Sequence, residues 1–189
     1  TPAPTGRGNV ISWARTYKDS MNIIYTAEGY TPIVGGTWMQ YCDPRSWSAG
    51  SRYTERVRVQ DNGGSTIMDN ISADSLKEQG YFYFAWKSAV MNAGDDYRLV
   101  LTPDDNNTRR WRVWIDFDYD GNFESGEMVI DEVHNGELTT DYFSVPAGAN
   151  PGVTRMRVSD RSGSTAEGPC SRYETGEVED YTIEIMNSS

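Results

Sequence analysis

The sequence lacks the parts that the common classes of hydrolase require. It contains no Gly-x-Ser-x-Gly nucleophile elbow and no His-Glu-x-x-His metallopeptidase motif. Its single histidine, His134, precedes Asn-Gly, which predicts a solvent-exposed turn. Acidic residues are plentiful enough to supply a pair for glycoside hydrolysis, and that alternative stays open. We expect no catalytic residues, because the clearest acids belong to a metal-binding pattern.

Positive charge and long apolar runs are also scarce. Lysine and arginine number 17 against 28 aspartates and glutamates, so the formal net charge is -11. Nucleic acids and anionic membrane surfaces attract clustered lysine and arginine, so neither is expected as a partner. No run of about eighteen apolar residues is present, which argues against membrane insertion. The acidic composition favours cation binding instead.

The acidic residues include one loop, at 116–127, that matches the calcium-loop pattern D-x-[DN]-x-[DN]-G-x5-E at every constrained position. Ca²⁺ binds six to eight oxygen atoms, which a curling backbone can supply from alternate side chains. Gly121 stands where the pattern needs a sharp turn. An acidic surface turn that binds nothing is the alternative. The expected Ca²⁺ ligands are three aspartates, one backbone carbonyl and one bidentate glutamate, in chain order Asp116, Asp118, Asp120, Asn122 and Glu127.

The residues before this loop predict a strand rather than the helix of an EF-hand. Trp111, Val113, Ile115 and Phe117 stand at every second position. A period of two among aromatic and β-branched residues is typical of a strand. The calcium loop is therefore expected at the end of a strand.

Cysteine is the other scarce residue, with only Cys42 and Cys170 in the chain. Such a pair is compatible with one disulfide or with two unrelated thiols. Calcium is plentiful outside cells and scarce in the cytosol, so a calcium-dependent fold and a disulfide point to the same compartment. We therefore predict a Cys42–Cys170 disulfide in a secreted, extracellular protein.

Short strand-like runs alternate with turns that are rich in glycine, proline and asparagine. This pattern predicts an all-β fold, a two-sheet antiparallel β-sandwich of the jelly-roll kind. Helix signals are weak and confined to 72–78, with Ser72 as N-cap. Residues 1–40 are expected to form a linker and one or two added strands, packed on a domain at 41–189. The strand-like runs are 9–13, 22–25, 56–59, 81–86, 97–101, 112–117, 154–158 and 181–185.

Aromatic residues make up 12% of the chain, and several stand in polar, turn-rich stretches where burial is not assured. An exposed ring suits stacking on a sugar or anchoring a peptide. The alternative is that these rings cover one end of the sandwich. The candidate ligand-binding residues are Trp38, Tyr41, Trp47, Tyr53 and Tyr173.

Five motifs, in order along the chain, resemble the GEVED domain family of secreted bacterial proteins. The family's name-giving motif stands at 176–181 as Gly-Glu-Val-Glu-Asp-Tyr, and the cysteines lie where the family tends to carry them. The resemblance covers about 41–186. The other matching runs are Trp-Arg-Val-Trp-Ile-Asp-Phe-Asp-Tyr-Asp-Gly-Asn-Phe at 111–123, Phe-Ser-Val-Pro at 143–146 and Thr-Arg-Met-Arg-Val at 154–158.

The resemblance implies an accessory β-sandwich module that stands beside extracellular hydrolases, such as metallopeptidases and polysaccharide-degrading enzymes. It does not name the ligand. We expect a monomeric module that binds extracellular polysaccharide and tethers an attached hydrolase or adhesin. Recognition of a matrix protein or peptide, or a spacer role in a secreted peptidase, is the alternative.

Three acids of the GEVED motif stand at the start of an alternating strand. Glu177 and Glu179 would point to one face of that strand and Asp180 to the other. Any of them could complete the calcium shell, or pair with an arginine such as Arg155 or Arg157. The sequence leaves these two roles open.

Overall fold

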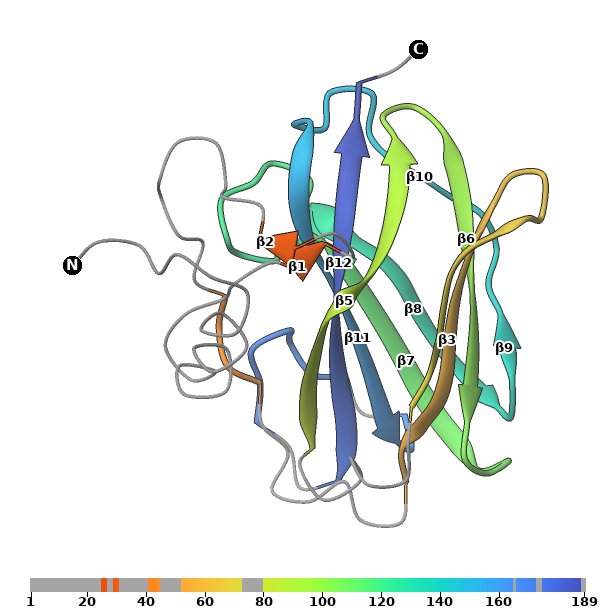
Figure 1. Ribbon diagram of the computed structural model, residues 1–189. Helices are drawn as coiled ribbons and strands as arrows, with labels where there is room; N and C mark the ends of the chain where they lie inside the picture. The colour runs from red at the N-terminus through yellow and green to blue at the C-terminus, as the bar shows by residue number, and fades with distance from the viewer. Residues whose placement is uncertain are drawn as a thin grey trace.

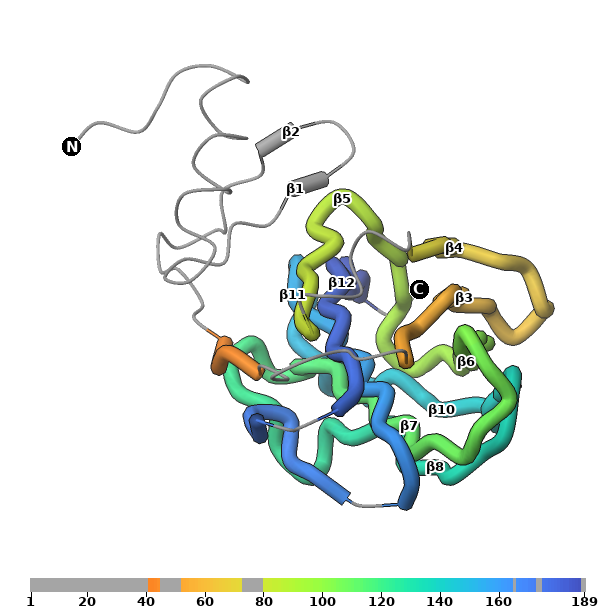
Figure 2. Tube along the Cα trace, turned by 90° about the horizontal axis from the view of Figure 1, so that it is seen from below, coloured from red at the N-terminus to blue at the C-terminus, as the bar shows by residue number. Residues whose placement is uncertain are grey.

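The computed structural model describes residues 25–26, 29–30, 41–44, 52–72, 80–164, 166–172 and 175–187. These residues form a β-sandwich of two five-stranded sheets, with a separate two-stranded hairpin of β1 (Tyr25–Thr26) and β2 (Gly29–Tyr30). Figure 1 shows the strands running roughly parallel to the long axis, and Figure 2, seen along them, shows the two layers. The all-β sandwich expected from the sequence is confirmed. Among the described residues, no helix is long and apolar enough to cross a membrane.

The first sheet has the order β10-β6-β3-β4, with β9 beside β10 on the same edge of β6. Its strands pair antiparallel throughout. Their bounds are β3 Thr54–Asp61, β4 Thr66–Ile71, β6 Asp96–Pro103, β9 Leu138–Thr139 and β10 Phe143–Ser144.

The second sheet has the order β5-β12-β11-β7-β8 and carries both sequence features singled out above. The GEVED motif begins β12, and the calcium-loop pattern follows β7. Strands β12 and β5 pair parallel, so this sheet is mixed rather than purely antiparallel as expected. Its bounds are β5 Tyr81–Asn92, β7 Thr108–Ile115, β8 Met128–Asn135, β11 Gly152–Ser162 and β12 Gly176–Met186.

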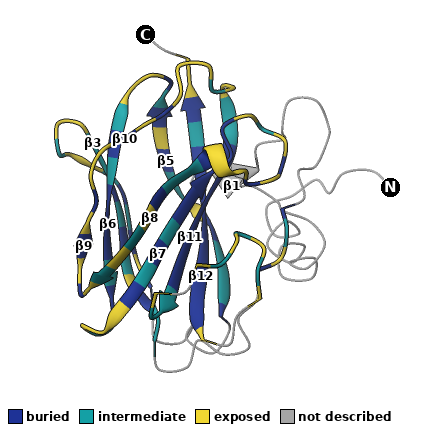
Figure 3. Ribbon diagram, turned by 180° about the vertical axis from the view of Figure 1, so that it is seen from behind, coloured by how far each residue is buried: buried dark blue, intermediate teal, exposed yellow. Residues whose placement is uncertain are grey.

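The main core lies between the sheets and follows the alternation read from the sequence. Trp111, Val113 and Ile115 of β7 are fully buried there. In the same sheet, Met156 of β11 pairs with Ile115, and Tyr181 of β12 pairs with Met156. Figure 3 shows β7, β11 and β12 buried over most of their length and the turns exposed. Six of the eight strand-like runs overlap these two sheets. The run 9–13 and residues 22–24 lie outside the described residues, and Tyr25 belongs to β1.

A second, smaller core covers the outer face of the β7–β11–β12 sheet. Tyr41, Trp114 and Phe123 are buried together, with Tyr119 and Met128 packed against them. The Cys42–Cys170 disulfide closes over this face with 5.5 Å between the Cα atoms, as predicted from the sequence. The outer face of this sheet is therefore also a packed interior.

Two local expectations differ from the structure. His134 is a half-buried residue near the end of strand β8, paired with Arg109, and not part of the turn, which begins only at Gly136. Strands β4 and β8 were not expected, because neither shows a clear alternation of apolar residues. The helix expected at 72–78 lies outside the described residues beyond Ser72.

Candidate metal centre and its surroundings

The calcium-loop pattern begins where β7 ends. The amide of Asp116 donates to the carbonyl of Arg155 on β11 at 3.1 Å, so the first ligand position is fixed to the sheet. The chain then curls with positive φ at Tyr119 (71°) and Gly121 (86°). A residue with a side chain is disfavoured at such φ values, which explains why a glycine stands at position 121.

This curl brings the predicted acidic ligands together. Carboxylate oxygens of Asp116, Asp118 and Asp120 lie within 4.8 Å of one another, and so do those of Asp118, Glu124 and Glu127. Two oxygens that share a Ca²⁺ ion at 2.3–2.6 Å can lie at most about 5 Å apart. Each group by itself therefore fits a hard cation, and Asp118 is common to both groups. Glu124 was not among the predicted ligands.

Backbone amides aim the two buried carboxylates. Asp116 accepts from the amides of Tyr119 at 2.7 Å and Gly121 at 3.1 Å. Glu127 accepts from the amides of Phe117 at 2.6 Å and Glu124 at 3.1 Å. Both ends of the pattern are thereby tied back onto the loop.

The exposed members of the loop are held more locally. The amide of Asp120 donates to Asp118 at 3.2 Å, and the amide of Asn122 donates to Asp120 at 2.7 Å. The side-chain amide of Asn122 also donates to Asp120 at 3.0 Å. The use of the Asn122 carbonyl as a ligand stays a prediction.

Burial opposes the ionised state of the two inner carboxylates. Asp116 is fully buried, and this burial raises its pKa despite the hydrogen bonds that it accepts. Burial likewise raises the pKa of Glu127 to about 7. A bound cation would favour the ionised form of both groups and remove this cost.

Tyr41 reaches the same loop from a distant part of the sequence. Its hydroxyl donates to Asp116 Oδ2 at 2.6 Å, and its ring packs on Phe123 with 5.1 Å between centroids. The ring is 5% exposed, so Tyr41 cannot present a stacking face as the sequence analysis expected. Tyr41 is instead part of the surroundings of the candidate metal centre.

Beneath Tyr41, Asp180 of the GEVED motif is linked to the loop through Arg155. The guanidinium of Arg155 lies between the rings of Tyr41, at 4.4 Å, and Tyr83, at 3.9 Å. It also contacts Asp180 Oδ2 at 3.1 Å. Asp180 is thus connected to the candidate metal centre through Arg155 and is not among its ligands.

Arg157 connects the same aspartate to both ends of the disulfide. It donates to both carboxylate oxygens of Asp180 at 2.8 Å. It also donates to the carbonyls of Cys42 at 3.0 Å and Pro169 at 2.8 Å. The disulfide segments and the GEVED aspartate therefore share one buried arginine.

The two glutamates of the motif face the other way, into the sandwich. Glu177 accepts from the amide of Thr54 at 2.7 Å, and Glu179 accepts from the hydroxyls of Tyr181, at 2.6 Å, and Ser72. Glu177 lies five residues along β12 from Thr182, which pairs with the Arg155 that anchors the loop. That spacing is about 17 Å for Glu177 and about 10 Å for Glu179. Because both side chains also face away from Arg155 and Asp180, the glutamates do not join the calcium loop.

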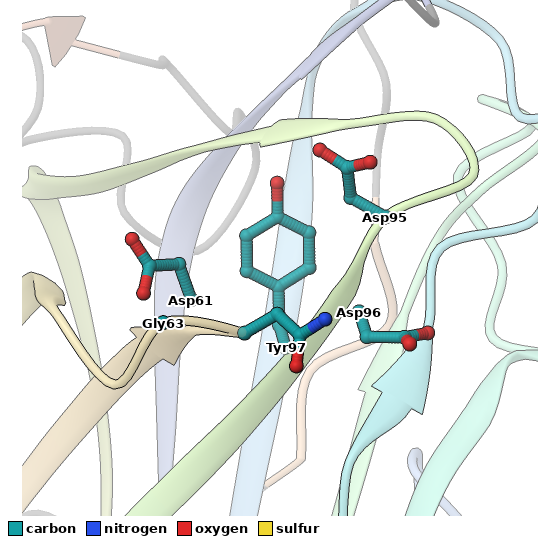
Figure 4. Close-up of a pocket in the computed structure, with 6 residues that line it drawn as sticks. Asp61, Gly63, Asp95, Asp96 and Tyr97 are labelled. Carbon is teal, nitrogen blue, oxygen red and sulfur yellow. The ribbon is translucent and has the colours of Figure 1, made fainter.

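A separate pocket of about 290 Å³ lies where the β3–β4 and β5–β6 turns meet. Figure 4 shows the ring of Tyr97 standing between the carboxylates of Asp61 and Asp95. Asp61 accepts from the amide of Ser65 at 2.8 Å, and Asp95 accepts from the side chain of Asn92 at 2.9 Å. These acids stabilise their own turns, and we assign no ligand to the pocket.

The predicted ligand-binding aromatics are only partly described. Trp38, Trp47 and Tyr173 lie outside the described residues. Tyr53 is half-buried, and its amide donates to Asp104 at 3.0 Å, so its ligand role stays a prediction.

Trp86 was not among the predicted binding residues, yet it is 54% exposed on edge strand β5. It lies where the pairing of β5 with β12 shifts, between Phe84 and Ser88. Such a bulge changes the direction of a side chain, and the aromatic-rich run 81–86 gave no sign of it in the sequence. Edge-to-face contacts with Phe82 and Phe84, at 5.9 and 5.7 Å between centroids, hold the ring.

Comparison with known proteins agrees with the motifs. Residues 110–184 match the family model of the GEVED domain. No curated protein matches the chain. Among solved structures, a family 123 glycoside hydrolase from Clostridium perfringens is similar, with a TM-score of 0.31 and 15% sequence identity. That likeness covers 61% of this chain and 24% of the hydrolase, so the chain spans about a quarter of its length.

The family match covers both features that organise the second sheet. It begins within β7, runs through the calcium-loop pattern, and ends within β12 after the name-giving motif. The match therefore identifies a GEVED domain at residues 110–184 of this chain.

Proposed function

We propose that this protein is a non-catalytic, calcium-stabilised extracellular module that binds polysaccharide. One observation carries the calcium part, namely the convergence of the Asp116, Asp118 and Asp120 carboxylates within 4.8 Å at the end of β7. The family supports an accessory role rather than an enzymatic one.

In this proposal, Ca²⁺ is held by the side chains of Asp116, Asp118, Asp120 and Glu127 and by the Asn122 carbonyl. The ion supplies the positive charge that the crowded loop lacks. The loop residue Phe123 is 8% exposed and belongs to the second core, against Tyr41 and Trp114. Ordering the loop therefore orders the cover on the outer face of the sheet.

The extracellular location is supported by the Cys42–Cys170 disulfide. Disulfides persist in oxidising compartments, and those compartments also hold free calcium at high concentration. Both stabilising devices would be lost in a reducing, calcium-poor cytosol.

For the ligand, Trp86 is the described residue that best suits a sugar. It presents half of an indole ring to solvent from a strand, and neighbouring rings restrict its motion. The flat apolar face of a pyranose stacks on such a ring at little cost in conformational entropy. Trp38 and Trp47 lie outside the described residues, and their part in ligand binding stays a prediction. Capture of a matrix peptide, which an acidic surface would favour for basic sequences, is the second candidate.

Calcium titration followed by thermal unfolding tests the first part. At a free Ca²⁺ concentration of 100 times the Kd, mass action adds about 2.7 kcal/mol, or roughly 5–10 °C in Tm. Chelator should reverse the rise, and Asp118→Asn should abolish it. Asp141→Asn, at an exposed aspartate outside the loop, is the matched control and should respond like the wild type. A Tm that ignores calcium in the wild type would refute this part.

Pull-down on insoluble polysaccharides and on collagen tests the second part. Trp86→Ala should lower retention on a polysaccharide at least tenfold with an unchanged melting curve. Tyr142→Ala, at another exposed aromatic, is the control and should retain wild-type binding. Retention on collagen alone would favour the matrix candidate, and retention on neither would favour a spacer.

A further inference from the structure

We propose that Tyr41 is a positioning residue of the calcium site and that the Cys42–Cys170 disulfide holds it in place. The redox state of the disulfide then sets the affinity of the loop for Ca²⁺. This inference rests on the calcium loop proposed above, and it assigns a role to residues that the loop pattern does not contain.

The first step is the contact between Tyr41 and a ligand. The Tyr41 hydroxyl donates to Asp116 Oδ2 at 2.6 Å, while Asp116 Oδ1 accepts from the Tyr119 amide at 2.7 Å. Oδ2 also accepts from the Gly121 amide at 3.1 Å, and donors on both oxygens together fix the rotation of the carboxylate. Partners that orient a ligand in this way typically change metal affinity 10–100-fold when they are removed.

Tyr41 is held in place through the disulfide of its neighbour Cys42. Residues 41–44 belong to no strand, and Tyr41 is the neighbour of Cys42 in the chain. The covalent tie of this segment to the domain is the bond from Cys42 to Cys170, 128 residues away in sequence. Opening that bond leaves the backbone as the one covalent connection and frees the segment to move, because its other contacts are individually weak hydrogen bonds and ring contacts.

The third step is the rigid base under the disulfide. Arg157 donates to the carbonyls of Cys42 and Pro169, so both segments that the disulfide joins rest on one buried side chain. Arg157 is paired in turn with Asp180, which is fully buried. The closed disulfide therefore holds the segments around Cys42 and Cys170 against the buried Arg157 side chain of the sheet. The same point lies beside Arg155, which stacks on the ring of Tyr41 at 4.4 Å.

The disulfide is also within reach of a reductant, because Cys170 is exposed. Dithiothreitol supplies two electrons and two protons, the S–S bond breaks, two thiols form, and the reagent leaves as its cyclic disulfide. By linkage, Ca²⁺ must protect the disulfide by the same factor by which the disulfide improves Ca²⁺ binding. A tenfold coupling corresponds to about 30 mV in the two-electron reduction potential.

The experiment measures Ca²⁺ affinity of the full chain by isothermal titration, before and after reduction by dithiothreitol under nitrogen. We expect reduction to weaken binding about tenfold or more. The reduction potential of the disulfide should fall by the matching amount when calcium is added. Far-ultraviolet circular dichroism confirms that the reduced protein is still folded.

Tyr41→Phe keeps the proposal testable even if the reduced protein unfolds. This variant keeps the ring and the disulfide and loses only the hydroxyl, so Ca²⁺ affinity should drop about tenfold. Reduction of the variant should then weaken binding less than in the wild type, because the contact that it releases is already gone. The control is Tyr83→Phe. Tyr83 also stacks on Arg155, but its hydroxyl bonds Thr182, so affinity should not change.

The outcomes separate this inference from the proposed function. No Ca²⁺ binding by the oxidised wild type refutes the calcium loop itself. Binding that is equally tight in the oxidised wild type and in Tyr41→Phe leaves the loop standing and overturns the role of Tyr41. An unchanged Kd in a folded, reduced protein overturns the redox coupling.

Discussion

Strand β12 separates two buried clusters of titratable residues that are stabilised in different ways. On its outer face, Asp180 is paired with Arg155 at 3.1 Å and Arg157 at 2.8 Å. On its inner face, Glu177 and Glu179 accept hydrogen bonds from neutral donors. Neighbouring residues of one motif thus meet guanidinium groups on one side and amides and hydroxyls on the other.

The pKa values follow this division. Burial raises the pKa of Asp180, but the charges of Arg157 and Arg155 lower it by more than burial raises it. The pKa of Asp180 therefore lies below its usual range. Burial raises the pKa of Glu179 to about 7, and burial together with the charge of Glu179 raises that of Glu177 to about 9. Arginine lowers the carboxyl pKa on the outer face, whereas burial raises the carboxyl pKa values on the inner face.

The inner cluster also contains Asp160, which pairs directly with Glu177 in the strand register. Asp160 binds the buried Arg109, which is shared with Asp104 and Asp105. Burial still raises the pKa of Asp160 to about 7, although Arg109 opposes this rise. One arginine is shared among several acids, so its charge does not offset the effect of burial on the pKa of Asp160.

The largest effect expected from this contrast is that of Asp180→Asn. It leaves Arg155 and Arg157 without a carboxylate in a fully buried site, and breaking such a pair costs about 3–5 kcal/mol. Urea unfolding at pH 7.5 measures the loss.

The matched variant is Glu179→Gln, one residue earlier on β12 and equally buried. It removes a carboxyl group whose pKa is raised by burial and that pairs with no arginine among the described residues, so we expect little loss of unfolding free energy at pH 7.5. Equal losses in the two variants would abolish the distinction between the faces.

Gly176→Ala is expected to have the next largest effect. Gly176 has φ +134°, and an added Cβ would meet the Asp160 carbonyl oxygen of the neighbouring strand. Strain of this kind costs about 1–3 kcal/mol, and the clash would shift β12 relative to β11 where Glu177 faces Asp160. Thermal unfolding measures the loss, with Gly148→Ala, whose Cβ would meet open space, as control. A stable Gly176→Ala protein would show that this close approach is dispensable.

Much of the fold could be predicted because its strands obey simple periodicity. Trp111, Val113 and Ile115 alternate in sequence and line one core in the structure. Asp180 was placed opposite Glu177 and Glu179 by the same rule, and the hydrogen bonds agree. The parallel pairing of β5 with β12 was missed, because periodicity fixes the face of a strand and not its partner.

The site was predicted less completely for a related reason. The calcium loop is a local pattern, so its acids could be read directly from the chain. Tyr41 lies 75 residues before Asp116, and no spacing rule connects a tyrosine to an aspartate at that distance. The aromatic turn around Tyr41 was read as a binding surface because sequence shows polarity and not burial.

Glu177→Gln should change the pH dependence of stability. The folded-state pKa of Glu177 is raised to about 9 from 4.5, so the folded protein binds a proton that the unfolded chain releases. Its contribution is complete below about 4.5 and is lost as pH rises towards about 9, at up to about 1.4 kcal/mol per pH unit. Glu177→Gln should flatten this decline in urea unfolding between pH 5 and 9. Glu137→Gln, at an exposed glutamate, should leave it in place.

The smallest effect concerns an aspartate that is balanced by arginine as Asp180 is, but near the surface. Asp131 contacts Arg110 at 2.6 Å and Arg112 at 2.8 Å, and these arginines lower its pKa to about 2. Its contribution is therefore present above about 3.8 and is lost as pH falls towards about 2, opposite in sign to that of Glu177. Solvent screens this pair, so Asp131→Asn should cost less than about 1 kcal/mol at pH 7.

Salt provides the final check on the Asp131 prediction. Raising the salt concentration from 0.05 to 1 M, which shortens the Debye length from above 10 Å to about 3 Å, should remove most of the Asp131→Asn effect. The same salt should leave the Asp180→Asn effect largely intact, because no solvent reaches that site. If salt reduced the stability loss of both variants to the same extent, solvent would reach the cluster around Asp180. The two faces of β12 would then differ in their charged groups and not in their burial.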